Sequence, residues 1–249
     1  MQLSIVIPAH NEEFVIAETV KSLDKCLNGE IPGKYDILIV ADHCTDNTEG
    51  ILEELSVQYD NVKWIRNNDS PGFGMAVRRG LNSFKGDAVV LFMADSSDSP
   101  EDVLCYYKKL NEGYDCVFGS RFIKEGHIKN YPKYKLVLNR ITNSFIRLLF
   151  WYKYNDTTNA FKAYRKQVIE GCRPFLSPHF NLTVELPLKA VIRGYSYAVV
   201  PISWINRANR ISNLKIKEMG SRYFFIIFYC FIEKWMTHKD YYRKKKEKN

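Results

Sequence analysis

The chain has 249 residues, of which 46% are hydrophobic and 26% charged, and its formal net charge is +8. This composition fits one large globular domain, or one domain with an appendage, and excludes a disordered, collagenous or coiled-coil chain. Half of the excess charge lies in residues 239–249, where six basic residues stand against two acidic ones. The remaining body is only mildly basic, which argues against a nucleic-acid-binding protein.

The first eight residues, Met1–Pro8, are predicted to form a buried strand rather than a signal peptide. No basic segment precedes the apolar run, and two glutamates follow it closely. The six cysteines are far apart, mostly within apolar stretches, and form no Cys-x-x-Cys pair. We therefore expect reduced core cysteines in a cytosolic protein, without a zinc knuckle or a disulfide framework.

The first half of the chain alternates strand-length apolar runs with helical patterns. Apolar residues recur at helical spacing over 16–27 and 51–55, between predicted strands at 3–7, 37–41, 62–65, 88–93 and 115–118. This alternation predicts an α/β fold with a mostly parallel central sheet and helices on both faces. Ligands of such sheets bind beyond the carboxyl ends of the strands, so the polar residues there form the candidate site.

Beyond residue 120 the alternation breaks down. We expect an amphipathic helix over 136–150, a strand over 160–164, a helix over 184–192 and another strand over 195–202. Ten consecutive apolar residues follow at 223–232, too few for a helix to cross a bilayer, which takes roughly 20. They predict a C-terminal apolar helix. We accordingly divide the chain into a domain of residues 1–215 and an interfacial helix with a basic tail, 216–249.

Three predicted strands end in acidic clusters, at residues 11–13, 42–46 and 95–98. Acidic loops that converge on one edge of a parallel sheet suit Mg²⁺ or Mn²⁺ and a hydroxyl-rich ligand. The third cluster follows the most apolar strand and is the best metal candidate. Helix capping is the alternative explanation, because Ser99, Pro100 and Asp102 make a good helix start. Capping leaves Asp95 and Asp98 unexplained.

A glycine-containing loop, Pro71-Gly72-Phe73-Gly74, precedes a predicted helix that starts near Met75. Glycine lets the backbone approach a ligand, and the N-terminus of a helix favours phosphate. A simple loop-to-helix turn would have the same composition, so both interpretations stay open.

Six motifs carry a resemblance to a known family. Segments 4–13 (Ser-Ile-Val-Ile-Pro-Ala-His-Asn-Glu-Glu), 40–48 and 93–95 resemble family 2 glycosyltransferases of the GT-A fold. Segments 118–122, 159–165 and 200–212 resemble the polyprenyl-phosphate branch, which contains the dolichyl-phosphate mannose synthases. The similarity runs from about residue 2 to 215. It implies an inverting transfer of a hexose from a nucleotide-diphosphate sugar, of the GDP-mannose or UDP-glucose class, to a polyprenyl phosphate.

The resemblance also implies roles for individual residues. The donor-binding positions are Pro8, His10, Glu12, Val40, Asp42, Ala94, Asp95 and Arg121. The metal positions are Asp95, Ser97 and Asp98, and the acceptor positions are Lys135, Glu185 and Arg207. A leaving pyrophosphate needs a cation and basic side chains to stabilise its charge. The catalytic set is accordingly Asp95, Arg121, Lys135 and Arg207.

The chain departs from the family pattern at four positions. Met93 replaces the first Asp of the D-x-D element, and Ser97 stands where a Gln is found near the metal. His10 replaces a Tyr, and Asn213 replaces a Lys. These changes concern the metal geometry and the donor identity rather than the fold. Asp98 is the candidate that compensates for the carboxylate missing at position 93.

Two features bear on the acceptor. A phosphate monoester is already anionic near neutral pH, so it needs no dedicated base, whereas a hydroxyl acceptor does. His43 is the nearest candidate base. The apolar run 223–232, with Lys234, Trp235 and the lysine-rich tail, is typical of membrane interfaces. We expect a peripheral protein on the cytoplasmic face of a membrane; the alternative is a C-terminal helix packed on the domain.

Rival functions make different demands on the sequence. A sugar-1-phosphate nucleotidyltransferase should carry a glycine-rich, Arg-containing loop after the first strand, where this chain has Pro8-Ala9-His10-Asn11. Met93 motivates a catalytically inactive GT-A-like binding protein, and a glycosyltransferase with a hydroxyl acceptor also remains open. Nucleic-acid binding through the tail lacks a folded reader motif.

Overall fold

The computed structural model describes residues 1–206, 216–237 and 240–243. Its central sheet has seven strands in the order β3-β2-β1-β4-β7-β5-β8. The strands β3, β2, β1 and β4 are parallel, as are β5 and β8, whereas β7 is antiparallel to both β4 and β5. Their bounds are β1 Leu3–Ala9, β2 Tyr35–Ala41, β3 Val62–Arg66, β4 Ala88–Leu91, β5 Cys116–Ser120, β7 Lys162–Arg165 and β8 Tyr197–Pro201.

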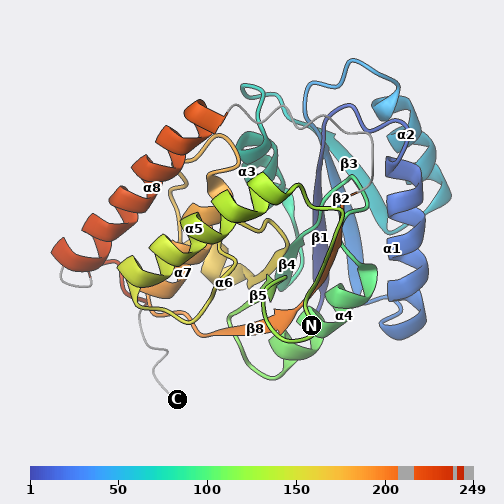
Figure 1. Cartoon of the computed structure of the whole chain (residues 1–249). Helices are drawn as coiled ribbons and strands as arrows, with labels where there is room; N and C mark the ends of the chain where they lie inside the picture. The colour runs from blue at the N-terminus through green and yellow to red at the C-terminus, as the bar shows by residue number, and fades with distance from the viewer. Residues whose placement is uncertain (207–215, 238–239, 244–249) are drawn as a thin grey trace.

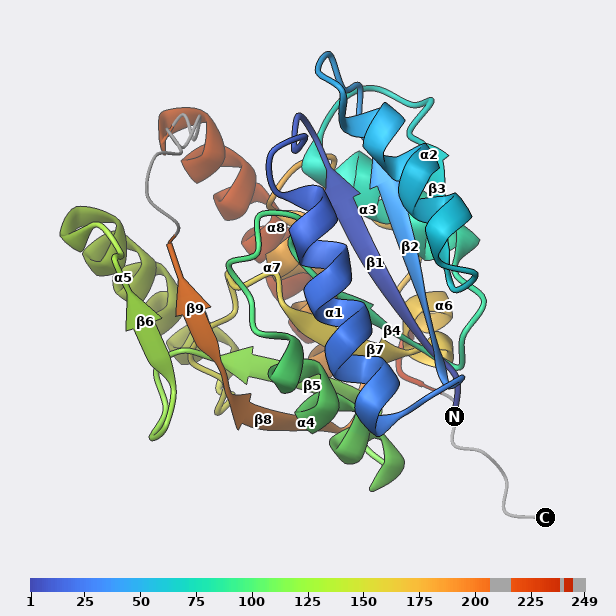
Figure 2. The same ribbon diagram turned by 90° about the vertical axis from the view of Figure 1, so that its right-hand side faces the viewer.

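Helices cover both faces of this sheet (Figure 1). One face carries α1 Ile16–Glu30, α2 Thr48–Gln58 and α4 Pro100–Asn111. The other face carries α3 Phe73–Ser83, α5 Lys133–Phe150, α6 Lys166–Gly171, α7 Leu182–Ile192 and α8 Ile216–Met236. Two short strands, β6 His127–Lys129 and β9 Ser203–Ile205, pair with each other outside the main sheet, as Figure 2 shows. The predicted α/β class with a mostly parallel sheet is confirmed.

The alternation of side chains along each strand produces two separate cores. In β1, Ile5 and Ile7 pack under α1, whereas Val6 between them packs under α3. Because successive side chains of a strand point to opposite faces, a run of apolar residues fills both layers. This explains why the parallel strands lack the apolar–polar alternation of a half-exposed sheet.

The structure departs from the predicted elements in two places. β4 ends at Leu91, two residues earlier than predicted. The Phe92 N–H still bonds to the Val6 carbonyl of β1, but the Met93 N–H bonds to Asp98. The predicted strand 160–164 is β7, whose antiparallel direction the strand–helix alternation does not predict.

α8 contributes to the same core as the rest of the chain. Its side chains are described from Gly220 onward, and Ile226, Ile227 and Cys230 are buried against α7 and its neighbours. The opposite side of α8 is exposed. The packing alternative for the apolar run 223–232 therefore holds for one face of the helix. Among the helices described, none is long and apolar enough to span a membrane.

Candidate active site

A cavity of about 400 Å³ lies at the carboxyl ends of β1 and β2, beside the N-terminus of α3. It brings together four of the predicted donor-binding residues, which come from separate segments of the chain: Pro8, His10, Glu12 and Asp42. The rest of the lining is apolar or glycine: Ala9, Pro71, Gly72, Phe73, Ala76, Met93 and Phe180. The sheet topology thus collects these residues at the edge where the sequence places a site.

Asp42 is held rigidly at the base of this cavity. Its Oδ1 accepts a hydrogen bond from Asn67 Nδ2 at 2.7 Å, and its Oδ2 accepts one from the Gly72 N–H at 2.9 Å. His10 Nδ1 lies 2.6 Å from the carbonyl oxygen of Asp42. His43 Nδ1 lies 3.1 Å from Asp42 Oδ1, and its side chain is 43% exposed. The sequence analysis did not predict Asn67 as a site residue. Its position directly after β3 is the signal that could have found it, because the other polar site residues also follow their strands.

The first two strand-end loops are bonded to each other through polar side chains. Asn11 Oδ1 accepts the Thr45 N–H at 2.8 Å, and Glu13 Oε2 accepts the Asn47 N–H at 2.9 Å. Acidic and amide side chains of these clusters therefore hold the two loops together through hydrogen bonds.

Three non-glycine residues of the strand-end loops have left-handed backbone conformations. They are Asn11 (φ 55°), His43 (φ 52°) and Ser96 (φ 54°), which follow β1, β2 and β4 respectively. Such conformations are unfavourable for L-residues and concentrate at functional sites. Their recurrence at three neighbouring strand ends supports a site at this edge of the sheet.

Asp95 and Asp98 form an acidic pair after β4. Asp95 is half-buried and its Oδ1 accepts the Ser97 N–H at 3.0 Å. Asp98 is 5% exposed; its Oδ2 accepts the Met93 N–H at 3.2 Å, while its Oδ1 has no hydrogen-bond partner within the described residues. Burial, and then the negative charge of Asp95, raise the pKa of Asp98 to about 8.

A divalent cation fits this pair. The buried oxygen of Asp98 lacks a partner, and a second carboxylate stands beside it. No cluster of three His, Cys, Asp or Glu side chains that could hold a metal occurs in the described part of the chain. A pair of carboxylates suits Mg²⁺ or Mn²⁺, which commonly binds one or two carboxylates together with substrate phosphates.

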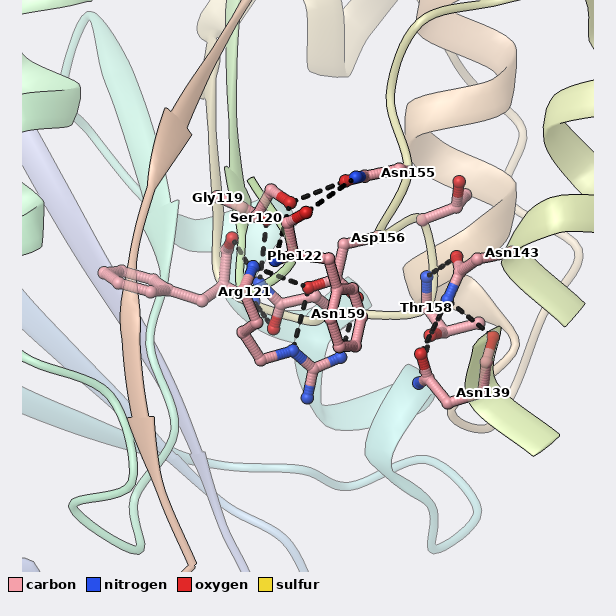
Figure 3. Close-up of polar contacts among 12 residues, drawn as sticks. Gly119, Ser120, Arg121, Phe122, Asn139, Asn143, Asn155, Asp156, Thr158 and Asn159 are labelled. Carbon is pink, nitrogen blue, oxygen red and sulfur yellow. Dashed lines mark hydrogen bonds and ion pairs between the residues drawn. The ribbon is translucent and has the colours of Figure 1, made fainter. Parts of the chain in front are cut away.

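Arg121 is enclosed by an ion pair and aromatic rings. Its Nε and Nη2 donate to Asp156 Oδ2 and Oδ1 at 2.8 and 2.7 Å, as Figure 3 shows, and Asp156 is fully buried. The rings of Phe122, Tyr131 and Trp204 lie 5.4–5.8 Å from the guanidinium carbon. Burial alone would lower the pKa of Arg121, but Asp156 outweighs it and raises the pKa. A direct contact with donor phosphates stays a prediction.

Other predicted site residues lie outside the cavity lining. Val40 and Ala94 are buried at 0% and 2% exposure, so their side chains belong to the core. Ser97 is also buried, and Lys135 lies in the first turn of α5. Arg207 lies outside the described residues.

Glu185 lies inside the protein and outside the cavity lining. It is fully buried, and its carboxylate accepts the N–H groups of Leu176 and Ser177 at 2.8 Å each and pairs with Lys189 at 2.5 Å. In this structure Glu185 holds a loop, and a contact with a bound acceptor stays a prediction.

The glycines before α3 make their close approach to this same loop. A Cβ at Gly74 would lie 2.6 Å from the Pro178 carbonyl carbon, and Gly72 has a φ of +151°. Phe73 stacks on Phe180, with ring centroids 4.2 Å apart and planes 10° apart. The loop after α6 therefore packs directly on the helix start, where the sequence predicted a ligand or a simple turn.

The mostly parallel sheet, with the cavity and the carboxylates at its strand ends, is the arrangement of an α/β protein that binds its ligand at the carboxyl edge of the sheet. Residues 4–172 match the family model for glycosyl transferase family 2. The chain belongs to this family, which confirms the resemblance seen in the six motifs.

The similarity to curated relatives spans most of the chain. It is 33% identical over 223 residues to a dolichol-phosphate mannosyltransferase of Pyrococcus furiosus, covering 88% of this chain and 61% of the relative. It is 26% identical to glycosyltransferase AglD of Haloferax volcanii, covering 36% of that protein, and 27% identical to a polyprenol monophosphomannose synthase of Mycolicibacterium smegmatis, covering 82%. The chain thus spans less than two thirds of the first two relatives.

Solved structures share the fold. Glucosyl-3-phosphoglycerate synthase from Mycobacterium tuberculosis, in complex with UDP, superposes with a TM-score of 0.68 at 20% identity, over 94% of this chain and 79% of that one. The same enzyme in complex with Mn²⁺, UDP and glucosyl-3-phosphoglycerate gives a TM-score of 0.68 at 19% identity. At this identity the likeness establishes the fold.

Proposed function

We propose that the protein is a hexosyltransferase that moves a sugar from a nucleotide-diphosphate donor to a polyprenyl phosphate. The observation that carries this proposal is the juxtaposition of the cavity with the Asp95–Asp98 pair at the carboxyl edge of the sheet. The names of the Pyrococcus and Mycolicibacterium relatives support the lipid-phosphate acceptor. The donor class is that of GDP-mannose or UDP-glucose.

A divalent cation is part of this proposal. Asp95 and Asp98 would hold Mg²⁺ or Mn²⁺, and Ser97 contributes through its N–H, which fixes Asp95. The Mn²⁺ and UDP bound by a protein of the same fold support the assignment. When bound, the cation would neutralise negative charge on the donor diphosphate.

The residues of the chain divide the remaining work. Asp42 and the cavity around it bind the nucleoside end of the donor. Contacts with Asn67, Gly72 and His10 hold the carboxylate and backbone of Asp42 in place for this role. Arg121 supplies positive charge behind the carboxylate pair, where its charge lowers the pKa of Asp98 against the stronger effect of burial. A phosphate acceptor arrives as an anion, so no side chain needs to remove a proton from it.

Turnover with a panel of donors tests this function. UDP- and GDP-sugars are incubated with polyprenyl phosphate and Mg²⁺ or Mn²⁺, and the lipid-linked product is measured. We expect product with the lipid phosphate and none with the free polyprenol. Equal activity on the alcohol would assign a hydroxyl acceptor, while donor binding without any turnover would identify a binding protein.

We also propose that the protein attaches to a membrane surface through two helices. On α8, Phe224, Phe225 and Phe228 are 53–65% exposed, on the side opposite its buried face. The adjacent helix α5 exposes Tyr134, Val137, Leu138, Ile141, Phe145 and Leu148. Lys234 links the helices by donating to the Phe150 carbonyl at 2.7 Å, and Figure 1 shows them side by side.

The charge around this apolar surface favours anionic lipid as its partner. Residues 126–155, which contain α5, include six Lys or Arg and no Asp or Glu. Basic residues at a membrane surface are worth about 1 kcal/mol each when the lipid is anionic. Apolar residues flanked by cations are the composition of helices that lie in the interface.

Co-sedimentation with vesicles tests the attachment. The full chain should bind phosphatidylcholine vesicles that contain phosphatidylglycerol, and less so as salt rises from about 0.1 M to about 1 M, where the Debye length falls from about 10 Å to about 3 Å. Replacing Phe224, Phe225 and Phe228 by Ser should release it. Val57→Ser, at an 80% exposed position on α2, is the control. Truncation after Gly220 is unsuitable, because it removes core residues of α8. A full chain that ignores these vesicles at low salt would refute the attachment.

A further inference from the structure

We propose that Phe180 forms the wall on which the donor's nucleobase stacks, and that Glu185 positions it. This inference deepens the proposed function and rests on it. Phe180 comes from the loop between α6 and α7, far in sequence from the strand-end residues, yet it lines the same cavity as His10 and Asp42. The residue is 36% exposed although its ring stacks on Phe73, so Phe180 is not fully covered by the protein.

The residues that line the cavity suit the base of the donor better than its diphosphate. Among the described residues that line it, none is Lys or Arg, and two are acidic, Glu12 and Asp42. A diphosphate would be repelled there. A base needs apolar surface for its flat faces and polar groups at its edge. The stacked pair Phe73 and Phe180, 4.2 Å apart, supplies the first, and the carboxylates supply the second.

The loop that carries Phe180 is fixed by hydrogen bonds at the three residues 176–178, just before it. Glu185 accepts hydrogen bonds from the N–H groups of Leu176 and Ser177, which precede Phe180 in the loop. Beyond them, the Pro178 carbonyl accepts the Met75 N–H at 3.2 Å, which ties the loop to the first turn of α3. Phe180 is therefore held against Phe73 before any ligand binds.

The ion pair between Glu185 and Lys189 explains why position 185 is acidic. Lys189 Nζ lies 2.5 Å from Glu185 Oε1 and also donates to the Pro174 carbonyl at 2.6 Å. Both side chains are fully buried. The pair thus connects α7 to both ends of the segment 174–177, and an uncharged residue at position 185 would release the loop from the helix.

Equilibrium binding of UDP and GDP in the presence of Mn²⁺ tests the wall. Loss of an aromatic stacking partner for a base weakens binding roughly five- to a hundredfold. Phe180→Ala should raise the Kd of whichever nucleotide binds by about tenfold or more, and Phe180→Tyr should restore it. Tyr114→Ala is the matched control, because Tyr114 is 37% exposed and outside the cavity; its Kd should equal that of the wild type.

Glu185→Gln tests the positioning role without leaving a buried lysine beside an alanine cavity. It should raise the same Kd, and the double variant with Phe180→Ala should bind no more weakly than Phe180→Ala alone, because both changes remove one interaction. Circular dichroism checks that each variant is folded. Multiplicative effects of the two changes would overturn the positioning role.

The outcomes separate this inference from the function on which it rests. Wild-type protein that binds a nucleotide while Phe180→Ala binds it equally well would overturn the inference alone. A loss confined to nucleotide sugars, with UDP and GDP unaffected, would assign Phe180 to the hexose and overturn the base assignment. Wild-type protein that binds neither UDP nor GDP would overturn both.

Discussion

The buried ion pair between α7 and α8 allows a quantitative prediction about how the C-terminal helix is attached. Arg193 Nε and Nη2 donate to Glu233 Oε1 and Oε2 at 2.6 and 2.9 Å, and both side chains are 4% exposed. Glu233→Ala leaves the guanidinium buried without a counter-charge. Breaking a buried pair in this way costs about 3–5 kcal/mol. In a domain of this size, about 1 kcal/mol shifts the melting temperature by about 2–4 °C.

We therefore expect the melting temperature of Glu233→Ala to fall by roughly 6–20 °C in a calorimetric or circular dichroism melt. An exposed pair provides the control. Lys109 and Glu112 are 38% and 50% exposed, and such pairs contribute at most about 1 kcal/mol, so Glu112→Ala should shift the melt by about 4 °C or less. Equal shifts for the two variants would refute the reasoning and would favour a helix separable from residues 1–215.

Three further predictions concern the site and the elements beside it. Asp95→Asn should fold normally yet lower turnover at saturating donor at least about a hundredfold, because charge stabilisation is lost; near-normal rates would refute the assignment. Gly74→Ala should destabilise the protein by about 1–3 kcal/mol in urea unfolding, because its Cβ would lie 2.6 Å from a carbonyl carbon of Pro178; an unchanged midpoint would contradict the packing of that loop. Burial raises the pKa of Asp102 from 3.8 to about 6, so the protonated form stabilises the fold below about pH 4 and this contribution is lost as pH rises through 6. The free energy of unfolding of Asp102→Asn should therefore rise relative to that of the wild type as the pH increases from about 4 to 7. A difference between the two proteins that does not change with pH would exclude the shift.

The parallel half of the fold could be predicted because its signals are local. Strand-length apolar runs such as 3–7 and 37–41 can be buried only between two layers, and helical spacing between them supplies those layers. The meeting of His10 and Asp42 at one edge follows from the same rule, since parallel strands end there. Their donor-binding role is implied by the family resemblance and stays a prediction.

The second half could not be predicted as well, because its contacts join distant segments. Asp156 pairs with Arg121 over 35 residues, and Phe180 meets Phe73 over more than a hundred. No periodicity encodes such pairs. The run Asn155-Asp156-Thr157-Thr158-Asn159 carries the one available signal, a polar stretch whose five members are all buried or half-buried, between apolar segments. The contacts of Glu185 are a further example, because its partners Leu176 and Ser177 are identifiable only from the fold.

Met93 stands at the junction between the apolar cavity and the carboxylate pair. It belongs to the cavity lining with Phe73 and Phe180, while its N–H donates to Asp98 Oδ2 at 3.2 Å. An aspartate at position 93 would add a third negative group beside Asp95 and Asp98, where burial and Asp95 already raise the pKa of Asp98. With methionine there, two carboxylates remain, and the second comes from residue 98 instead of residue 93. Because Asp98 retains a buried oxygen without a partner among the described residues, the site keeps two carboxyl groups and an open ligand position for a divalent cation. The substitution at position 93 is therefore compatible with an active transferase, and it does not by itself favour a catalytically inactive binding protein.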